Sequence, residues 1–357
     1  MGQPFIDFKH VTKQFDAFKA LDDVSLSIPE GCFMTLLGPS GCGKTTLMRQ
    51  LAGFSEPESG DIYLKGKRVN GLPPYKRGTP LVFQEYALFP HMTVYENISY
   101  GLRLQKLNKE ETALKVSQML DTFSLKGMEK RFPRQLSGGQ QQRVAFARAL
   151  IMGQQVLLLD EPLSNLDAKL RVEVRSELRQ IQRRLGITVI YVTHDQDEAL
   201  SMSDQIAVMR AGKIEQVGTP WEMYFRPQNR FVADFVGTVN FLDVEVTAVE
   251  ENVMRLKWEG ESFLIPRQNG FSTGEQAVLA LRPECMRIVS GSEEKAVFSG
   301  SVEFASFLGR YVRYWVTVNG RTLIIDDSNP SINGTVQGEV QLCLDTQKMH
   351  LLKPETN

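Results

Sequence analysis

The chain of 357 residues has no long hydrophobic run. Its apolar stretches, such as 156–159 and 188–192, have the length of strands. None approaches the roughly 20 apolar residues that a membrane-spanning helix needs. The N-terminal segment also lacks the basic region and apolar stretch of an export signal. We therefore expect a chain that does not cross a bilayer by itself and stays in the cytoplasm.

Cysteine and net charge are also scarce. The four cysteines, Cys32, Cys42, Cys285 and Cys343, include no close CxxC pair. This spacing disfavours a disulfide framework or a zinc site and favours reduced thiols in a cytosol. The formal net charge is −1, so nucleic acid is not an expected partner. What remains is the composition of a globular protein, with 42% hydrophobic and 23% charged residues.

A helical insert interrupts the first part of the chain. The early segments alternate apolar and other residues as strands do, for example over 24–28. Between Asn108 and Phe123 the apolar residues recur with the period of a helix, and Asn108 with Glu111 matches a helix start. The sequence therefore predicts a helix here, between the early strands and those that follow.

The later segments indicate two domains, as the length of the chain also does. From Val156 uniformly apolar strands alternate with helices, which indicates a mostly parallel sheet covered on both faces. Asp195, with Glu198 three residues on, indicates the start of one of these helices. Beyond about Phe235 alternating strands and tight turns replace the helices. We expect an α/β domain over 1–235, with a helical subdomain at about 86–150, and a small all-β, barrel-like domain over 236–357.

The stretch GPSGCGKT, residues 38–45, follows a short apolar strand and opens a helix. This is the context of a phosphate-binding loop, in which glycines let backbone N–H groups converge on phosphate oxygens. We expect Lys44 to reach the β and γ phosphates of a nucleoside triphosphate and the Thr45 hydroxyl to bind Mg²⁺. The expected nucleotide-binding residues of this loop are Gly38, Pro39, Ser40, Gly41, Cys42, Gly43, Lys44, Thr45 and Thr46.

Two carboxylates follow the apolar strand at 156–159. Asp160 and Glu161 come at its carboxyl end, where open α/β sheets bind ligands. We expect Asp160 to help hold Mg²⁺ and Glu161 to polarise a water for attack on the γ phosphate. The sequence therefore predicts a hydrolytic site and not only a binding site.

A second helix start with anion-binding character lies at LSGGQ, residues 136–140. Ser137 is a suitable cap, and the following glycines leave backbone N–H groups accessible. We expect Ser137, Gly138, Gly139 and Gln140 to bind an anion, such as a phosphate of the nucleotide, and the alternative is a helix cap with a flexible approach.

The strings GPSGCGKTT, LSGGQQQRVAFARAL and VLLLDEP, in this order, resemble the ATP-binding cassette of ABC transporters. The resemblance covers about residues 5–236 and implies the P-loop NTPase fold. It also implies that Phe15 stacks on adenine, although a lone Phe in that setting is more often part of a core. Gln84 would contact Mg²⁺ and the attacking water. Asp167, in SNLD, would lie in a loop that crosses a dimer interface, and His194 would contact the γ phosphate.

The resemblance also implies an assembly. Since the chain has one phosphate loop and one LSGGQ helix, a head-to-tail homodimer of cassettes would hold two ATP molecules between its subunits. The absence of a span would put the permease on two other, integral-membrane chains. This separation of span and cassette favours an importer, in which the chain would be the ATP-hydrolysing subunit and ATP-dependent dimer closure would drive uptake. Such an importer would also use an extracytoplasmic solute-binding protein, and the ATPase would lie on the cytoplasmic face of the membrane.

The C-terminal part resembles the TOBE-like domain that is attached to import cassettes, on the strings FVADFVGTVNFL and LALRPE. Residues 86–105 are most similar to the polyamine and ferric iron branches, and a phosphonate-like cargo also fits. A soluble ABC ATPase that acts in translation or DNA maintenance is the alternative function. A third interpretation makes the C-terminal domain a regulatory binding module.

Overall fold

The computed structural model describes residues 4–105, 107–289, 297–329 and 334–354. The chain forms two compact units, Met1–Pro220 and Trp221–Asn357, and each has a hydrophobic core of its own. The expected domain division at residue 235 and the helical subdomain at about 86–150 stay predictions. By contact, the segment 221–235 is grouped with the second unit.

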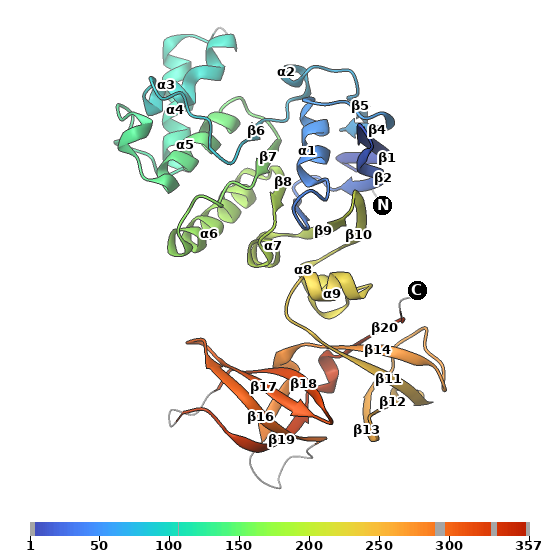
Figure 1. The fold of residues 1–357 in the computed structure, drawn as a ribbon. Helices are drawn as coiled ribbons and strands as arrows, with labels where there is room; N and C mark the ends of the chain where they lie inside the picture. The colour runs from blue at the N-terminus through green and yellow to red at the C-terminus, as the bar shows by residue number, and fades with distance from the viewer. Residues whose placement is uncertain (1–3, 106, 290–296, 330–333, 355–357) are drawn as a thin grey trace. The chain divides into compact units, whose positions relative to one another are not determined.

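The first unit contains a six-stranded sheet, in the order β10-β9-β3-β8-β7-β6, and a four-stranded antiparallel sheet, in the order β2-β1-β4-β5 (Figure 1). The larger sheet is parallel except for β10, so the expected mostly parallel sheet is confirmed. Its strands are β3 (Phe33–Leu37), β6 (Leu81–Val82), β7 (Val156–Asp160), β8 (Thr188–Thr193), β9 (Gln205–Arg210) and β10 (Lys213–Gly218). The smaller sheet consists of β1 (Ile6–Phe15), β2 (Phe18–Ile28), β4 (Ser59–Leu64) and β5 (Lys67–Arg68).

The helices of the first unit are spread along its larger sheet and beyond the end of it (Figure 1). They are α1 (Lys44–Ala52), α2 (Pro74–Arg77), α3 (Val94–Ser99), α4 (Lys109–Thr122), α5 (Gly138–Leu150), α6 (Ala168–Leu185) and α7 (Gln196–Met202), with short 3₁₀ turns at Tyr100–Gln105 and Pro133–Gln135. Figure 1 shows α3, α4 and α5 together at one end of this unit, and α1 beside the smaller sheet at the other. Among the described residues, no helix is both long and apolar enough to span a membrane.

The central strands are buried on both faces. In β3 and β8, Phe33 and Tyr191 point into the core shared with α3 to α6, whereas their neighbours Met34 and Ile190 point into the core shared with α1 and the smaller sheet. This alternation follows from the two-residue period of a strand. It explains why these strands are uniformly apolar in sequence.

Side-chain caps start the helices that the sequence predicted. Asn108 Oδ1 accepts from Glu111 N at 2.8 Å, and the Glu111 carboxylate accepts from Asn108 N at 3.2 Å, so this capping box at the start of α4 is confirmed. Asp195 caps α7 in a similar way, accepting from Glu198 N at 3.0 Å. Such caps satisfy backbone donors that a helix cannot pair internally.

The second unit contains two antiparallel five-stranded sheets around one core, in the orders β13-β12-β11-β14-β20 and β15-β19-β16-β17-β18. In β17, Val312, Tyr314 and Val316 are buried at alternate positions, which confirms the predicted all-β tail. Its strands are β11 (Asn240–Val249), β12 (Val253–Trp258), β13 (Glu261–Pro266), β14 (Gln276–Leu281), β15 (Met286–Val289), β16 (Phe298–Phe307), β17 (Val312–Val318), β18 (Arg321–Asp327), β19 (Gly338–Leu344) and β20 (His350–Leu352). Its helical segments are α8 (Pro220–Phe225), α9 (Arg230–Phe235) and 3₁₀ turns at Pro283–Cys285 and Thr346–Lys348.

Arg282, which follows β14, ties the segment 221–238 to the second unit. Its guanidinium is buried and donates to the carbonyl oxygens of Ala233 at 2.8 Å and Gly237 at 2.7 Å. It also donates to the carbonyl of Tyr224 and lies 4.2 Å from the centre of that residue's ring. Burial removes water from the charged guanidinium and lowers the pKa of Arg282. The hydrogen bonds to these carbonyls compensate for the lost water.

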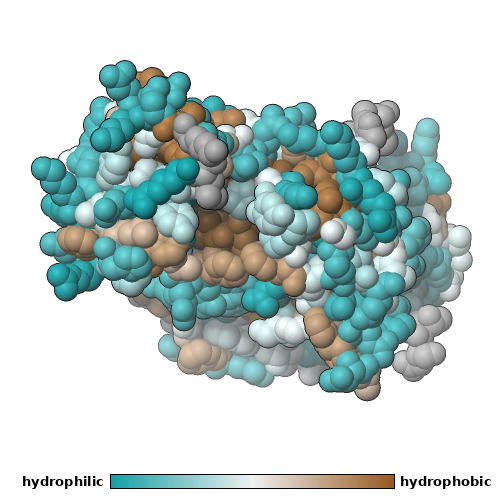
Figure 2. Space-filling view, turned by 90° about the horizontal axis from the view of Figure 1, so that it is seen from above, coloured by the Kyte–Doolittle hydropathy of each residue, from teal (hydrophilic) through white to brown (hydrophobic). Residues whose placement is uncertain are grey.

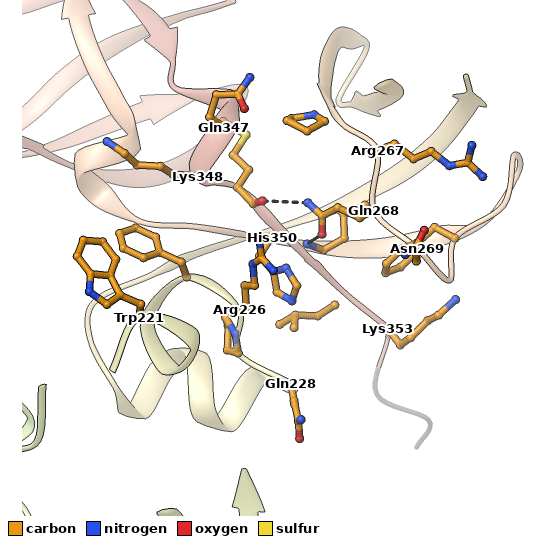
Figure 3. Close-up of a pocket in the computed structure, with 17 residues that line it drawn as sticks. Trp221, Arg226, Gln228, Arg267, Gln268, Asn269, Gln347, Lys348, His350 and Lys353 are labelled. Carbon is orange, nitrogen blue, oxygen red and sulfur yellow. Dashed lines mark hydrogen bonds between the residues drawn. The ribbon is translucent and has the colours of Figure 1, made fainter. Parts of the chain in front are cut away.

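A cavity of about 760 Å³ lies in the second unit, between the segment after α8, the loop after β13, and β20 (Figure 3). Gln268 joins two of its walls, because its side chain donates to Met349 O at 2.9 Å and accepts from Leu351 N at 3.0 Å. Lys348 and Lys353 also line this cavity, and they pair with Asp345 and Glu275.

We expect Arg282→Lys to lower the free energy of unfolding of the second unit by about 2 kcal/mol, because an ammonium cannot serve several separate carbonyls at once. The chain has three tryptophans, Trp221, Trp258 and Trp315, and all lie in this unit. Their emission during urea unfolding therefore measures the unit directly. The control is Arg255→Lys, at an exposed position of β12; an equal loss in both variants would contradict this role of Arg282.

Candidate nucleotide-binding site

The predicted phosphate loop runs from β3 into α1 and depends on glycine for its shape. Gly41 and Gly43 have φ values of +78° and +108°, in the region that favours glycine. At Gly38 a Cβ atom would lie 2.3 Å from the carbonyl oxygen of Met209 in β9. The loop therefore lies so close to β9 that only glycine, which has no Cβ atom, fits at position 38.

Lys44, the first residue of α1, is buried within the loop. Its ammonium donates to the carbonyl oxygens of Gly38 at 2.7 Å and Pro39 at 2.9 Å, and lies 3.7 Å from Cys42 Sγ. These contacts hold the positive charge beside the start of a helix, whose N–H groups attract anions. The loop thus combines the donors that a phosphate group requires.

Thr45 and Asp160 meet, although they are far apart in sequence. The Thr45 hydroxyl donates to Asp160 Oδ1 at 2.9 Å. Burial raises the pKa of Asp160, while the hydrogen bond from Thr45 opposes the shift. A desolvated carboxylate beside a hydroxyl is a suitable donor set for Mg²⁺, which prefers oxygen ligands. These two residues fit the predicted metal site.

Glu161 and His194 are also brought together, because β7 and β8 are neighbouring parallel strands that end at the same edge of the sheet. His194 Nδ1 lies 3.2 Å from Glu161 Oε1. Glu161 has a φ of +46°, which is strained for this residue type, and its N–H donates to Val192 O at 3.0 Å. Strain of this kind is common at functional sites, and here it directs a carboxylate towards the imidazole.

Gln84 lies after β6, beside the loop at 164–167. The Gln84 carbonyl accepts a hydrogen bond from Asn165 Nδ2 at 3.1 Å. Tyr86 and Ala87, two and three residues after Gln84, have positive φ values, and their carbonyls accept from Arg148 of α5 at 2.9 and 2.8 Å. Arg148 is thus a supporting residue that sequence reasoning missed, since nothing in the helix pattern of 138–150 indicates this long-range contact.

The predicted residues Ser137 and Gln140 form a capping box at the start of α5, with backbone-to-side-chain distances of 3.3 and 3.0 Å. Cβ atoms built at Gly138 and Gly139 would lie 3.1 and 3.3 Å from the side chains of Leu166 and Leu170. Within the described part of the chain, no hydrogen bond or ion pair links residues 137–140 to the phosphate loop. The structure of one chain therefore does not bring these two predicted elements together.

Phe15 and Asp167 lie at the surface. The Phe15 ring, at the end of β1, is 51% exposed, so the ordinary interpretation of this residue as part of a core is wrong. Lys13 Nζ lies 5.3 Å from the centre of this ring. Asp167 caps α6 by accepting from Leu170 N at 2.9 Å. Both side chains are accessible to another molecule, and their nucleotide contacts stay predictions.

Comparison with known proteins decides the family. A family model described as ABC transporter matches residues 21–164, and one described as TOBE domain matches residues 279–352. An Fe(3+) ions import ATP-binding protein of Rhizobium etli is 46% identical over 97% of both chains. A spermidine/putrescine import ATP-binding protein of Clostridium novyi is 43% identical over 99% of both. The chain belongs to the ABC transporter ATP-binding proteins.

Solved structures agree with this assignment. The structure of cbiO1 from Clostridium perfringens, part of an ABC transporter complex, has a TM-score of 0.60 and 30% identity, covering 63% of this chain and 92% of that one. A dimeric ATP-binding cassette, MJ0796, bound to ADP and Pi, has a TM-score of 0.54 and 31% identity, covering 60% and 98%. The chain is the ATP-hydrolysing subunit of an ABC importer. The relatives give no support to the alternative of a soluble ATPase.

Cys42 makes the phosphate loop of this import ATPase testable by thiol chemistry. We expect N-ethylmaleimide to react slowly, because Cys42 is 4% exposed, and to abolish ATP binding once the adduct fills the loop. Mg-ATP should slow the labelling. Cys32 and Cys285 should stay unmodified, because burial raises the pKa of each thiol to about 12.

The control is Cys42→Ser, which keeps the half-buried Cys343. This variant should still bind ATP after treatment with N-ethylmaleimide. Unchanged ATPase activity after complete labelling of Cys42 would contradict the prediction.

Proposed function

We propose that this import ATPase hydrolyses Mg-ATP at the edge of the sheet where β3, β7 and β8 end. The contact between Glu161 and His194, at 3.2 Å, carries the proposal. This contact joins a carboxylate and an imidazole, the groups that most often move protons in enzymes, and it lies at the ends of β7 and β8, of which β8 pairs with the strand β3 before the phosphate loop. The Thr45–Asp160 hydrogen bond at 2.9 Å joins the loop to the same strand end.

The roles of these residues follow from their chemistry. Lys44 and the N–H groups of 38–46 bind the β and γ phosphates, and Phe15 stacks on adenine. Mg²⁺, held by Thr45, Asp160 and Gln84, would neutralise phosphate charge. Glu161 accepts the proton of the attacking water, and His194 orients the carboxylate and contacts the γ phosphate. Positioning and charge stabilisation account for most of the catalysis in phosphoryl transfer.

A second copy of the chain would complete the site. Residues 137–140 start a helix of 13 residues and carry backbone N–H groups suited to phosphate, but they lie outside the contacts of the phosphate loop in their own chain. A head-to-tail homodimer would bring these residues, and Asp167, to the nucleotide of the other copy. The dimeric state of the related cassette MJ0796 supports this arrangement.

The face that would receive the permease has a groove of about 380 Å³ between α1, α2, β6 and α5. Figure 2 shows a hollow with hydrophobic side chains on the face that it views. Phe54 and Tyr75, which line the groove, are 57% and 83% exposed. Arg148 also lines it and donates to the backbone after Gln84. The groove is therefore connected to the nucleotide site through one loop.

We assign the chain to the cytoplasmic face of the cell membrane, where it binds two integral-membrane permease subunits that are served by an extracytoplasmic solute-binding protein. The cargo is a small solute. The similar ferric-ion and spermidine/putrescine import proteins support ferric iron or a polyamine over a phosphonate-like solute.

Glu161→Gln tests the assignment of the base. The variant should bind ATP with nearly unchanged affinity and hydrolyse it about 10²- to 10⁴-fold more slowly, because an amide does not accept the proton. Binding is measured by equilibrium titration and hydrolysis by phosphate release. Glu173→Gln, at an exposed position of α6, is the control. Wild-type turnover in Glu161→Gln would refute the proposal.

Tyr75→Glu tests the groove. The charge should abolish the stimulation of ATPase activity by the reconstituted permease and leave the basal rate of the isolated chain unchanged, because an apolar docking surface does not accept an unpaired charge. Leu114→Glu, on the exposed face of α4 and 62% exposed in the native chain, is the matched control. Normal stimulation in Tyr75→Glu would show that the permease docks elsewhere.

A further inference from the structure

Glu198, in the first turn of α7, is a buried carboxylate four residues after His194 in the sequence. Its side chain is 4% exposed. The hydroxyl groups of Tyr191 and Thr193 both donate to Glu198 Oε2, each at 2.7 Å. A buried carboxylate with two short hydrogen bonds is costly to remove and holds its neighbours in place.

The Thr193 hydroxyl holds the chain on both sides of His194. It donates to Glu198 and accepts from Asp195 N at 3.0 Å. Asp195 in turn accepts from Glu198 N at 3.0 Å. The residues immediately before and after His194 are thus both tied to Glu198, Thr193 through the carboxylate and Asp195 through the Glu198 backbone N–H, and this restrains the backbone of His194.

Two arginines of α6 face this carboxylate pair. Arg175 lies 3.2 Å from Asp195 and 3.6 Å from Glu198, and Arg171 lies 3.4 Å from Asp195. Arg171 also donates to the carbonyl of Leu166 at 3.1 Å. Leu166 belongs to the loop 164–167, so a continuous series of polar contacts connects this loop to the residues around His194.

The other end of the same loop touches the proposed base. The Ser164 hydroxyl donates to the carbonyl oxygen of Glu161 at 2.9 Å. The loop 164–167 therefore contacts Glu161 directly and His194 through the arginine and carboxylate cluster. A displacement of this loop would change the distance between the two side chains that are 3.2 Å apart.

We propose that Glu198 is a positioning residue, which with Asp195, Arg171 and Arg175 holds His194 against Glu161 and makes this contact depend on the loop 164–167. The proposal rests on the function proposed above, in which that loop faces the second copy. Closure of the homodimer would then move the loop 164–167, and the cluster would transmit this movement to the contact between His194 and Glu161. A cluster that served only to fix α7 on the sheet would affect stability but not His194 in the folded protein.

The decisive variant is Glu198→Gln, which keeps the size of the side chain and removes its charge. Because small displacements of reacting groups are costly, we expect kcat to fall about 10- to 100-fold while KM for ATP stays within about twofold. The imidazole signals of His194 in the nucleotide-free chain should move in a ¹H–¹³C correlation spectrum. The chain has four histidines, and His194→Gln assigns the signal. Those of His10, His91 and His350 should stay.

The matched control is Glu173→Gln, which removes one exposed carboxylate from α6 and should leave kcat and all four signals unchanged. Thr193→Val is the second variant, since it deletes only the hydroxyl that joins Glu198 to Asp195 N. Far-UV circular dichroism checks that each variant is folded. If Glu198→Gln does not fold, Thr193→Val decides in its place.

Either of two results overturns the proposal. The first is a wild-type kcat in the folded variant, and the second is a lowered kcat with an unmoved His194 signal. Failure of the proposed function is distinguishable, because it would appear as normal hydrolysis in Glu161→Gln. The His194 signal is recorded without nucleotide. It therefore tests whether the cluster holds His194 in place even if Glu161 is not the catalytic base.

Discussion

Parallel strands place their carboxyl ends at one edge of a sheet, and the nucleotide site of this protein depends on that constraint. Strands β3, β7 and β8 pair in register, so the phosphate loop, the Asp160–Glu161 pair and His194 all emerge side by side. The strands stay in register because both of their faces are buried, as the alternation of Phe33 and Met34 between two cores shows. A one-residue slip would exchange the faces of the whole strand.

Around this edge the chain uses strained or tightly held backbone. Glu161 has a positive φ, and Gly38 leaves no space for a side chain. Tyr86 and Ala87 hold a similarly unusual conformation because Arg148 binds their carbonyls. Such conformations persist only where surrounding contacts determine them. The loops at the site are therefore parts of a connected structure that extends to the groove between α1, α2, β6 and α5 and to the helix α6.

The second unit is built on another principle. Two antiparallel sheets share one core, and the buried guanidinium of Arg282 binds backbone carbonyls in both short helices before them. Arginine suits this position because its planar group donates in several directions at once.

The features that the sequence by itself determined are local. The glycine loop at 38–45, the carboxylates after the strand at 156–160 and the capping boxes of α4 and α5 are each contained within a few consecutive residues, where sequence spacing translates directly into geometry. The resemblance to ABC cassettes also rests on such short strings. The two cores and the all-β tail followed from the period of apolar residues.

Only the tertiary structure decided the contacts between distant residues. The Thr45–Asp160 hydrogen bond, the Glu161–His194 contact and the cluster around Glu198 each join different strands or helices, and their distances depend on how the sheet packs. From sequence, Asp195 and Glu198 indicated a helix start and nothing more, because a cap is local. Their partners Arg171 and Arg175 lie on α6, which the strand β8 separates from α7 along the chain. Side chains that meet across a fold have no signature in the spacing of either segment, which is why packing alone identified them.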